Sequence, residues 1–213
     1  MQIAFFVFDD FTALDAVGPY EVFRRMPGTE CVFVAPEAGP IRDHAETLTV
    51  FADAAIDDVP SPDVLVVAGG VGEAQMRTDE RVLDWVRAAH ASTTWTSSVS
   101  TGALILGAAG ILEGREATTY WLARELLQKY GATLAEDRVV IDGKVATSAG
   151  ITAGIDLALE LVERIEGDVI AQSIQLALEY DPDPPFDSGS PETAPAVITE
   201  LVRNQSRFAP RPT

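Results

Sequence analysis

The stretch "SSVSTGALILGAAGIL", residues 97–112, holds Ser100, the residue with the clearest potential for nucleophilic chemistry. A β-rich run ends just before Ser100 and a helical run begins just after it, which predicts a sharp strand-to-helix turn. Residues 98–102 follow the frame G-x-S-x-G of a nucleophile elbow, with Ser98 in place of the first glycine. Small residues permit the tight turn, and the helix start supplies free N–H groups. Serine is also a preferred helix N-cap, so a capping role for Ser100 is the alternative interpretation.

A serine nucleophile needs a general base, and the chain has two histidines, His44 and His90. His90 ends a predicted helix and precedes the strand 94–98, whereas Ser100 follows the far end of that strand, about 20 Å away. His44 could reach Ser100 only through a fold-back that the sequence does not predict. A Ser-His-Asp hydrolase is therefore disfavoured. A thiol at position 100 would suit this turn better, because about 1 kcal/mol of helix-dipole stabilisation helps a thiol to ionise but is too little for an alcohol.

Two further segments are predicted to reach the same edge of the sheet. Asp15 follows the first strand at a helix start, where it either acts as an acid/base facing the elbow or caps the helix. Gly69 and Gly70 end the third strand, where they either form a simple turn or bring backbone N–H groups close to a ligand. Ligands of parallel α/β sheets bind beyond the carboxyl ends of the strands, so these residues form a candidate site. The single cysteine, Cys31, lies within a strand and is predicted to be inert packing.

Alternating β-rich and helical runs must position these residues, and they predict an α/β fold. We expect a three-layer sandwich, with a mostly parallel sheet and helices on both faces, because the strands are nearly all apolar. Asp142-Gly143 between two β-rich runs predicts a type I′ hairpin. Pro19 in its first turn fits a helix that begins near residue 16. The predicted strands cover residues 3–8, 31–35, 64–68 and 94–98, and the predicted helices cover residues 16–25, 79–91, 102–109, 119–130, 151–165, 168–180 and 195–203.

Length and composition limit the classes of protein. The 213 residues are 47% hydrophobic, which is enough to form the core of one sizeable domain, and we predict that this domain covers residues 1–208. The end of the chain is expected to be loose from residue 207, and residues 209–213 are predicted to form a flexible tail. A formal net charge of −18 argues against nucleic acid or an anionic membrane surface as partner, and a small neutral ligand is compatible with it. No apolar run reaches the roughly 18 residues of a membrane span. The absence of a basic leader and the single cysteine indicate the cytoplasm.

Five segments together carry a family resemblance: "ALDAVGPYEVF", "LVVAGGVG", "SVSTGALILGAAGIL", "REATTYW" and "TSAGITAGIDLALELVE". They resemble the PfpI/ThiJ superfamily, whose fold is flavodoxin-like and similar to class I glutamine amidotransferases. The resemblance runs from residue 3 to about residue 208. Within the superfamily, "LALEYDPDPPFDSGSPETAP" is most similar to the isonitrile hydratases, which add water to R–N≡C and give an N-substituted formamide.

The resemblance implies a set of roles for this chain. It places the nucleophile at Ser100, the carboxyl acid/base at Asp15 and a supporting role at Thr101. It implies that the substrate-binding residues are Gly69, Gly70, Val71, Tyr120 and Trp121. The reaction would pass through a covalent thioimidate without a metal or an organic cofactor. The substrate would be a small neutral isonitrile, and the protein a homodimer.

Two departures from the family pattern bear on function. The elbow of the family normally reads V-C-T-G, so Ser100 replaces a cysteine, either as a natural variant or as a deliberate change; the intact remainder of the site favours the deliberate change. We predict little or no hydratase activity for the chain as it stands. Tyr120 occupies a place where relatives often have histidine, which bears on the choice of substrate.

Two competing hypotheses stay open. One is a binding or sensor domain that has lost its thiol and binds a small molecule without chemistry. The other is a glyoxalase-like enzyme of the same superfamily, which a thiol and a carboxyl group would also serve. A peptidase is disfavoured, because Thr101 follows the elbow residue where the peptidase branch has histidine.

Overall fold

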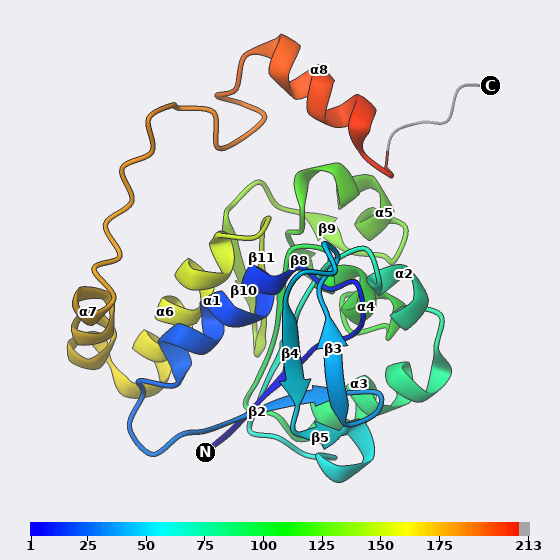
Figure 1. The fold of residues 1–213 in the computed structure, drawn as a ribbon, viewed down its shortest axis with the longest axis vertical. Coiled ribbons are helices and arrows are strands. Elements are labelled where there is room, and N and C mark those ends of the chain that lie inside the picture. The colour runs from blue at the N-terminus through cyan, green and yellow to red at the C-terminus, as the bar shows by residue number, and fades with distance from the viewer. Residues whose placement is uncertain (209–213) are drawn as a thin grey trace.

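A seven-stranded sheet forms the centre of the molecule (Figure 1). The computed structural model describes residues 1–208, and the predicted tail 209–213 lies outside them. Neighbouring strands of the sheet run parallel, except for the antiparallel pair β10–β11 at one edge. The order across the sheet is β10 (Val139–Asp142), β11 (Val145–Ser148), β7 (Trp95–Val99), β6 (Val64–Val67), β1 (Gln2–Phe6), β2 (Glu30–Ala35) and β5 (Ala54–Ala55).

Helices cover both faces of this sheet, which confirms the predicted three-layer α/β sandwich (Figure 1). One layer contains α1 (Ala13–Phe23), α6 (Ala153–Glu166) and α7 (Asp168–Ala177). The other contains α2 (Glu73–Met76), α3 (Glu80–Ser92), α4 (Gly102–Ala108) and α5 (Arg124–Gln128). No helix of residues 1–208 combines the length and the apolar character that a membrane span requires.

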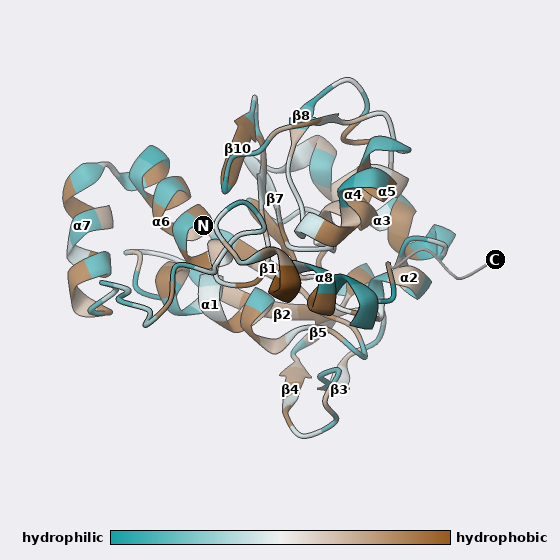
Figure 2. Ribbon diagram, turned by 90° about the horizontal axis from the view of Figure 1, so that it is seen from above, coloured by the Kyte–Doolittle hydropathy of each residue, from teal (hydrophilic) through white to brown (hydrophobic). Residues whose placement is uncertain are grey.

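Alternation along the strands divides the core into two clusters. On β1, Ile3 and Phe5 pack with the cluster under α1 and α6, whereas Ala4 and Phe6 pack with the cluster under α3 and α4. All four side chains are fully buried, as expected for a central strand of a parallel sheet with both faces covered. The helices carry hydrophilic as well as hydrophobic residues, as amphipathic outer layers do (Figure 2).

Smaller elements lie outside the predicted pattern. The segment after β2 forms a hairpin of β3 (Gly39–Arg42) and β4 (Thr49–Ala52), and β8 (Glu116–Ala117) pairs in parallel with β9 (Thr133–Leu134). A short 3₁₀ turn covers Ile56–Asp58, and a second one covers Trp121–Ala123, inside the stretch predicted as a helix. These elements have two to four residues each, too short for a periodicity to appear in the sequence.

Three predicted features are corrected by the structure. Helix α1 begins at Ala13 rather than near residue 16, so Pro19 lies inside the helix and not in its first turn. The helix predicted over 119–130 is only the 3₁₀ turn and α5, because hydrogen bonds tie Thr118 to Thr147 on β11 and Thr119 to the carbonyl of Ser100. The hairpin after β10 exists, but Asp142 still pairs with Val145, so its turn lies one residue later than predicted.

Candidate active site

Ser100 occupies a strained turn directly after β7. Its φ is 55°, a left-handed backbone conformation that is uncommon for residues other than glycine. Its N–H donates to the carbonyl oxygens of Ser148 and Ala149, both at 3.2 Å, and its own carbonyl accepts from Thr119 Oγ1 at 2.7 Å. The N-cap position of α4 is Thr101, so the capping interpretation of Ser100 is wrong. The strain is the geometry expected of an elbow that holds a side chain at the end of a strand.

The close approach of α4 to the sheet requires a glycine. A Cβ on Gly102 would lie 2.3 Å from the carbonyl oxygen of Val67, a distance that real Cβ atoms do not reach. Packing therefore requires the second glycine of the G-x-S-x-G frame at position 102, as the motif predicted.

Asp15 is buried in the first turn of α1 and is not its cap. The N-cap position belongs to Thr12, and the Asp15 side chain has no solvent exposure. Its Oδ2 accepts from the N–H of Gly69 at 3.0 Å, while Oδ1 has no hydrogen-bond partner within residues 1–208. Burial raises the pKa of Asp15 to about 8, although the backbone hydrogen bond from Gly69 acts in the opposite direction. Asp15 therefore keeps its proton at neutral pH.

The two glycines after β6 bring Asp15 and Thr101 together. The N–H of Gly70 donates to Thr101 Oγ1 at 2.9 Å, as that of Gly69 donates to Asp15. A Cβ on Gly69 would lie 2.7 Å from Asp15 Oδ2 and 2.7 Å from the backbone nitrogen of Thr101. Gly70 adopts a φ of 136°, which residues with a side chain rarely adopt. These N–H groups thus hold the acid and the threonine in place and are not directed at a ligand.

A cavity of about 160 Å³ opens beside the elbow. Of the predicted site residues, it is lined by Ser100, Thr101, Gly70, Val71 and Tyr120. Asp15 and Gly69 lie behind this wall, linked to it through the hydrogen bonds of the glycine pair. Four further lining residues were missed by the sequence analysis: Thr12, Ile151, Arg207 and Phe208.

A larger cavity of about 390 Å³ adjoins the first. Tyr120 and Ile151 line both, and Trp121 lines only the larger one. The rings of Tyr120 and Trp121 meet edge to face, with centroids 6.1 Å apart. Since Ser100 and Thr101 face the smaller cavity, the chemistry belongs there, and Trp121 can contact only a part of the ligand that extends away from the elbow.

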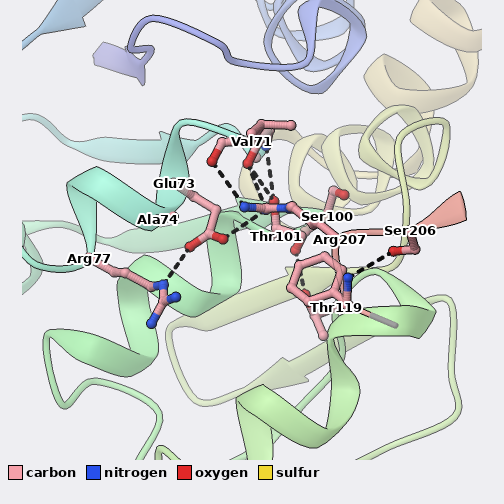
Figure 3. A network of polar contacts seen from close by, with 12 residues as sticks. Val71, Glu73, Ala74, Arg77, Ser100, Thr101, Thr119, Ser206 and Arg207 are labelled. Carbon is pink, nitrogen blue, oxygen red and sulfur yellow. Dashed lines mark hydrogen bonds and ion pairs between the residues drawn. The ribbon is translucent and has the colours of Figure 1, made fainter. Parts of the chain in front are cut away.

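The C-terminal segment closes the smaller cavity, which corrects the expectation of a loose chain end from residue 207. The Arg207 guanidinium donates to the carbonyl oxygens of Gly70 and Val71 at 3.1 and 3.0 Å (Figure 3). It also forms an ion pair of 2.8 Å with Glu73, a carboxylate without solvent exposure. The ring of Phe208 lies 6.4 Å from that of Tyr120. Ile151 lies within one of the quoted motifs and Thr12 directly precedes another, whereas nothing in the sequence marked Arg207.

The histidines and the cysteine lie away from this site. His90 Nδ1 contacts Thr96 Oγ1 at 2.9 Å, near the start of β7 and thus at the opposite end of that strand from Ser100. The backbone N–H of His44 bonds to the carbonyl of Phe11, so the fold-back does occur, but the His44 side chain is exposed and lines neither cavity. Burial raises the pKa of Cys31 on β2 to about 11, which keeps that thiol protonated.

Metal-ligating side chains do not gather in the part of the chain that the structure describes: no group of three or more His, Cys, Asp or Glu could hold an ion there. The polar groups near the cavity are instead a neutral carboxyl group, hydroxyl groups and a guanidinium. This set suits proton transfer and the binding of a small polar head.

Comparison with known proteins matches this architecture to one family. The model of the DJ-1/PfpI family matches residues 1–164. The chain belongs to the DJ-1/PfpI family. A solved THiJ/PfpI family protein from Pseudomonas syringae has 37% sequence identity and a TM-score of 0.92, over 98% of this chain and 88% of that one.

Two curated relatives show how the family varies. The isonitrile hydratase of Pseudomonas putida is 42% identical over 206 residues, 97% of this chain and 90% of its own length. The HTH-type transcriptional regulator CdhR of Pseudomonas aeruginosa is 29% identical over 143 residues, and the matched part is 42% of its length. The near full-length match is therefore to an enzyme, and the regulator shares only one region.

Proposed function

We propose that this chain has the site of an isonitrile hydratase and that Ser100 stands where the reaction needs a thiol. The observation that carries the proposal is Asp15, a fully buried carboxyl group with a pKa of about 8 that accepts a hydrogen bond from the N–H of Gly69 beside a strained elbow. A carboxyl group that keeps its proton at neutral pH can deliver it to a carbon as a bond forms there. The near full-length similarity to the Pseudomonas putida isonitrile hydratase supports the same reaction.

The reaction adds one water molecule to the terminal carbon of R–N≡C. A thiolate at position 100 attacks that carbon while Asp15 gives it a proton, which forms the thioimidate R–N=CH–S. Water then adds to the same carbon, and Asp15 carries a proton from this water to the nitrogen. The C–S bond breaks with its electron pair on sulfur, the new hydroxyl returns its proton to Asp15, and R–NH–CHO leaves. Thiolate and carboxylic acid are both restored.

Ser100 blocks the first step of this sequence. An alcohol is far less acidic than a thiol, and no histidine lies at the elbow to act as its base. The remaining groups of the site stay in place, so we propose that the chain binds a neutral isonitrile in the smaller cavity but converts little or none of it. Thr101 would support the elbow, and Gly70, Val71 and Tyr120 would contact the ligand.

The Ser100→Cys variant tests the proposal beside the unchanged chain. Formamide formation is followed from a simple alkyl and a simple aryl isonitrile, and covalent thioimidate is sought by mass spectrometry. Turnover by the variant and none by the unchanged chain is the expected result. Turnover by neither, with binding by both, would contradict the enzyme proposal and favour a binding domain; turnover of a 2-oxoaldehyde by the variant alone would favour a glyoxalase.

The assembly and compartment are proposed on separate grounds. Exposed apolar side chains on α7 and on the last helix, α8 (Ala196–Gln205), support a homodimer; among them are Val169, Leu176 and Val197, at 70 to 78% exposure. Sedimentation equilibrium would show twice the 22.8 kDa chain mass if this is right. The single free cysteine supports a reducing compartment such as the cytoplasm.

A further inference from the structure

Within residues 196–208, the C-terminal segment is anchored to the molecule by polar contacts of Arg207 at the candidate site, and Arg203 lies over the ring of Trp121. Helix α8 (Ala196–Gln205) contains no buried residue, so its packing alone holds it weakly. The two residues Arg207 and Phe208, just beyond it, contact the turn after β6 and the ring of Tyr120. A segment more than 130 residues away in sequence therefore supplies one wall of the elbow cavity.

Arg207 takes part in a charge cluster that is larger than a simple ion pair. Its Nη2 lies 2.8 Å from Glu73 Oε1, and Arg77 Nε lies 3.0 Å from Glu73 Oε2 (Figure 3). The Glu73 side chain has no solvent exposure, while the two arginine side chains are 26% and 31% exposed. Two cations and one anion leave a net charge of +1, within a chain whose formal net charge is −18.

This positive charge lies at the cavity of residue 100. Arg207 lines the same cavity of about 160 Å³ as Ser100 and Thr101. The carbonyl of Gly70 accepts from Arg207 at 3.1 Å and from the hydroxyl of Thr101 at 3.3 Å, so Arg207 is one hydrogen-bonded group away from the residue after Ser100. Backbone and Glu73 contacts fix the guanidinium, which cannot swing into solvent without losing all three.

We propose that Arg207 is an electrostatic positioning residue: its cluster with Glu73 and Arg77 holds a positive charge at the cavity and stabilises negative charge on the group at position 100. The reaction of the proposed function develops such a charge, since a thiolate attacks and is later restored. The proposal depends on that function only for assigning the reacting group to position 100.

The cluster allows a test in which two substitutions act in opposite directions. In the Ser100→Cys background, Arg207→Met lowers the charge of the cluster from +1 to 0, and Glu73→Gln raises it to +2. We expect Arg207→Met to raise the pKa of the introduced thiol by about one unit and Glu73→Gln to lower it by about half a unit. Arg207→Lys keeps the charge and should stay close to its parent.

The rate of thiol alkylation by iodoacetamide, measured from pH 5 to pH 9, reports this pKa without any isonitrile. The Ser100 chain gives the background from Cys31, whose pKa of about 11 makes it slow in this range. Two other titratable groups lie near the position: Tyr120 lines the same cavity, and Asp15 on α1 lies behind the cavity wall. Asp15 titrates in the same range, so each profile is repeated with Asp15→Asn.

Arg164→Met is the matched control, because it removes one exposed cation on α6, away from the cavity. Circular dichroism verifies that every variant is folded. Opposite shifts for Arg207→Met and Glu73→Gln, with slower alkylation by about five- to tenfold at pH 7 for the former, would support the proposal. An unchanged profile for Arg207→Met, shifts of the same sign for both variants, or an Arg207→Lys profile equal to that of Arg207→Met would overturn it. Absence of isonitrile hydration alongside opposite shifts would reject the proposed function and leave this inference standing.

Discussion

Two fully buried carboxyl groups lie near the candidate site, and their surroundings differ. Asp15, on the helix after β1, receives one backbone N–H, and no cation contacts it within the described residues. Glu73, on the helix after β6, lies between Arg77 and Arg207. Burial raises the pKa of both, but in Glu73 the two arginines oppose the effect of burial, whereas Asp15 reaches a pKa of about 8.

This difference in surroundings gives the two carboxyl groups different roles. A buried acid without a cation stays protonated at neutral pH and can act in proton transfer. A buried acid between two cations is ion-paired, and it holds the guanidinium that lines the cavity. Burial alone therefore does not identify a catalytic carboxyl group; the charges beside it decide.

The largest effect is expected from removing the proton donor. In the Ser100→Cys background, Asp15→Asn should lower formamide formation at least about 100-fold, because an amide cannot give or take the proton. Asp84→Asn, which changes an exposed carboxylate on α3, should leave the rate unchanged. A loss of less than about threefold for Asp15→Asn would remove Asp15 from the mechanism.

The next largest effect is expected on the way the free energy of unfolding changes with pH. The folded-state pKa of Asp15 is raised to about 8 from its ordinary value of 3.8, so its contribution to stability is greatest below pH 3.8 and is lost as pH rises toward 8. Asp15→Asn removes this loss. Relative to the parent, the variant should gain about 3 kcal/mol in free energy of urea unfolding between pH 5 and pH 8. Parallel pH curves for the two proteins would contradict the raised pKa.

Substitution of Glu73 should lower stability, in contrast to Asp15→Asn, because Glu73 has a structural role. Glu73→Ala should lower the free energy of unfolding by about 2 kcal/mol, less than the cost of breaking a fully buried ion pair, because Arg77 and Arg207 are partly exposed. The exposed pair offers a control, since Glu160→Ala should cost less than about 0.5 kcal/mol. Equal costs at the two positions would mean that the Glu73 cluster adds no stability.

Much of the site could be predicted because its signals are local. The small residues around Ser100 encode the elbow, and the glycine pair after β6 permits the close approach that brings Asp15 and Thr101 together. The exact role of these glycines was not predictable, since their N–H groups turn to Asp15 and Thr101 rather than to a ligand.

The rest depends on contacts that no local pattern encodes. Arg207 reaches the turn at Gly70 from the far end of the chain, and in the sequence it lies in a stretch without periodicity. The helix predicted over 119–130 is shortened by a tertiary contact, the hydrogen bond of Thr119 to Ser100, which overrides local propensity.

The protonation state of Asp15 is the most direct test of the account. The protein is labelled with ¹³C at aspartate carboxyl carbons, the Asp15 signal is assigned by its loss in Asp15→Asn, and its chemical shift is followed from pH 3 to pH 10. We expect Asp15 to keep the shift of a neutral acid at pH 7 and to titrate near pH 8. Titration of that signal near pH 4 would contradict it, because Asp15 would then have no proton to give at neutral pH.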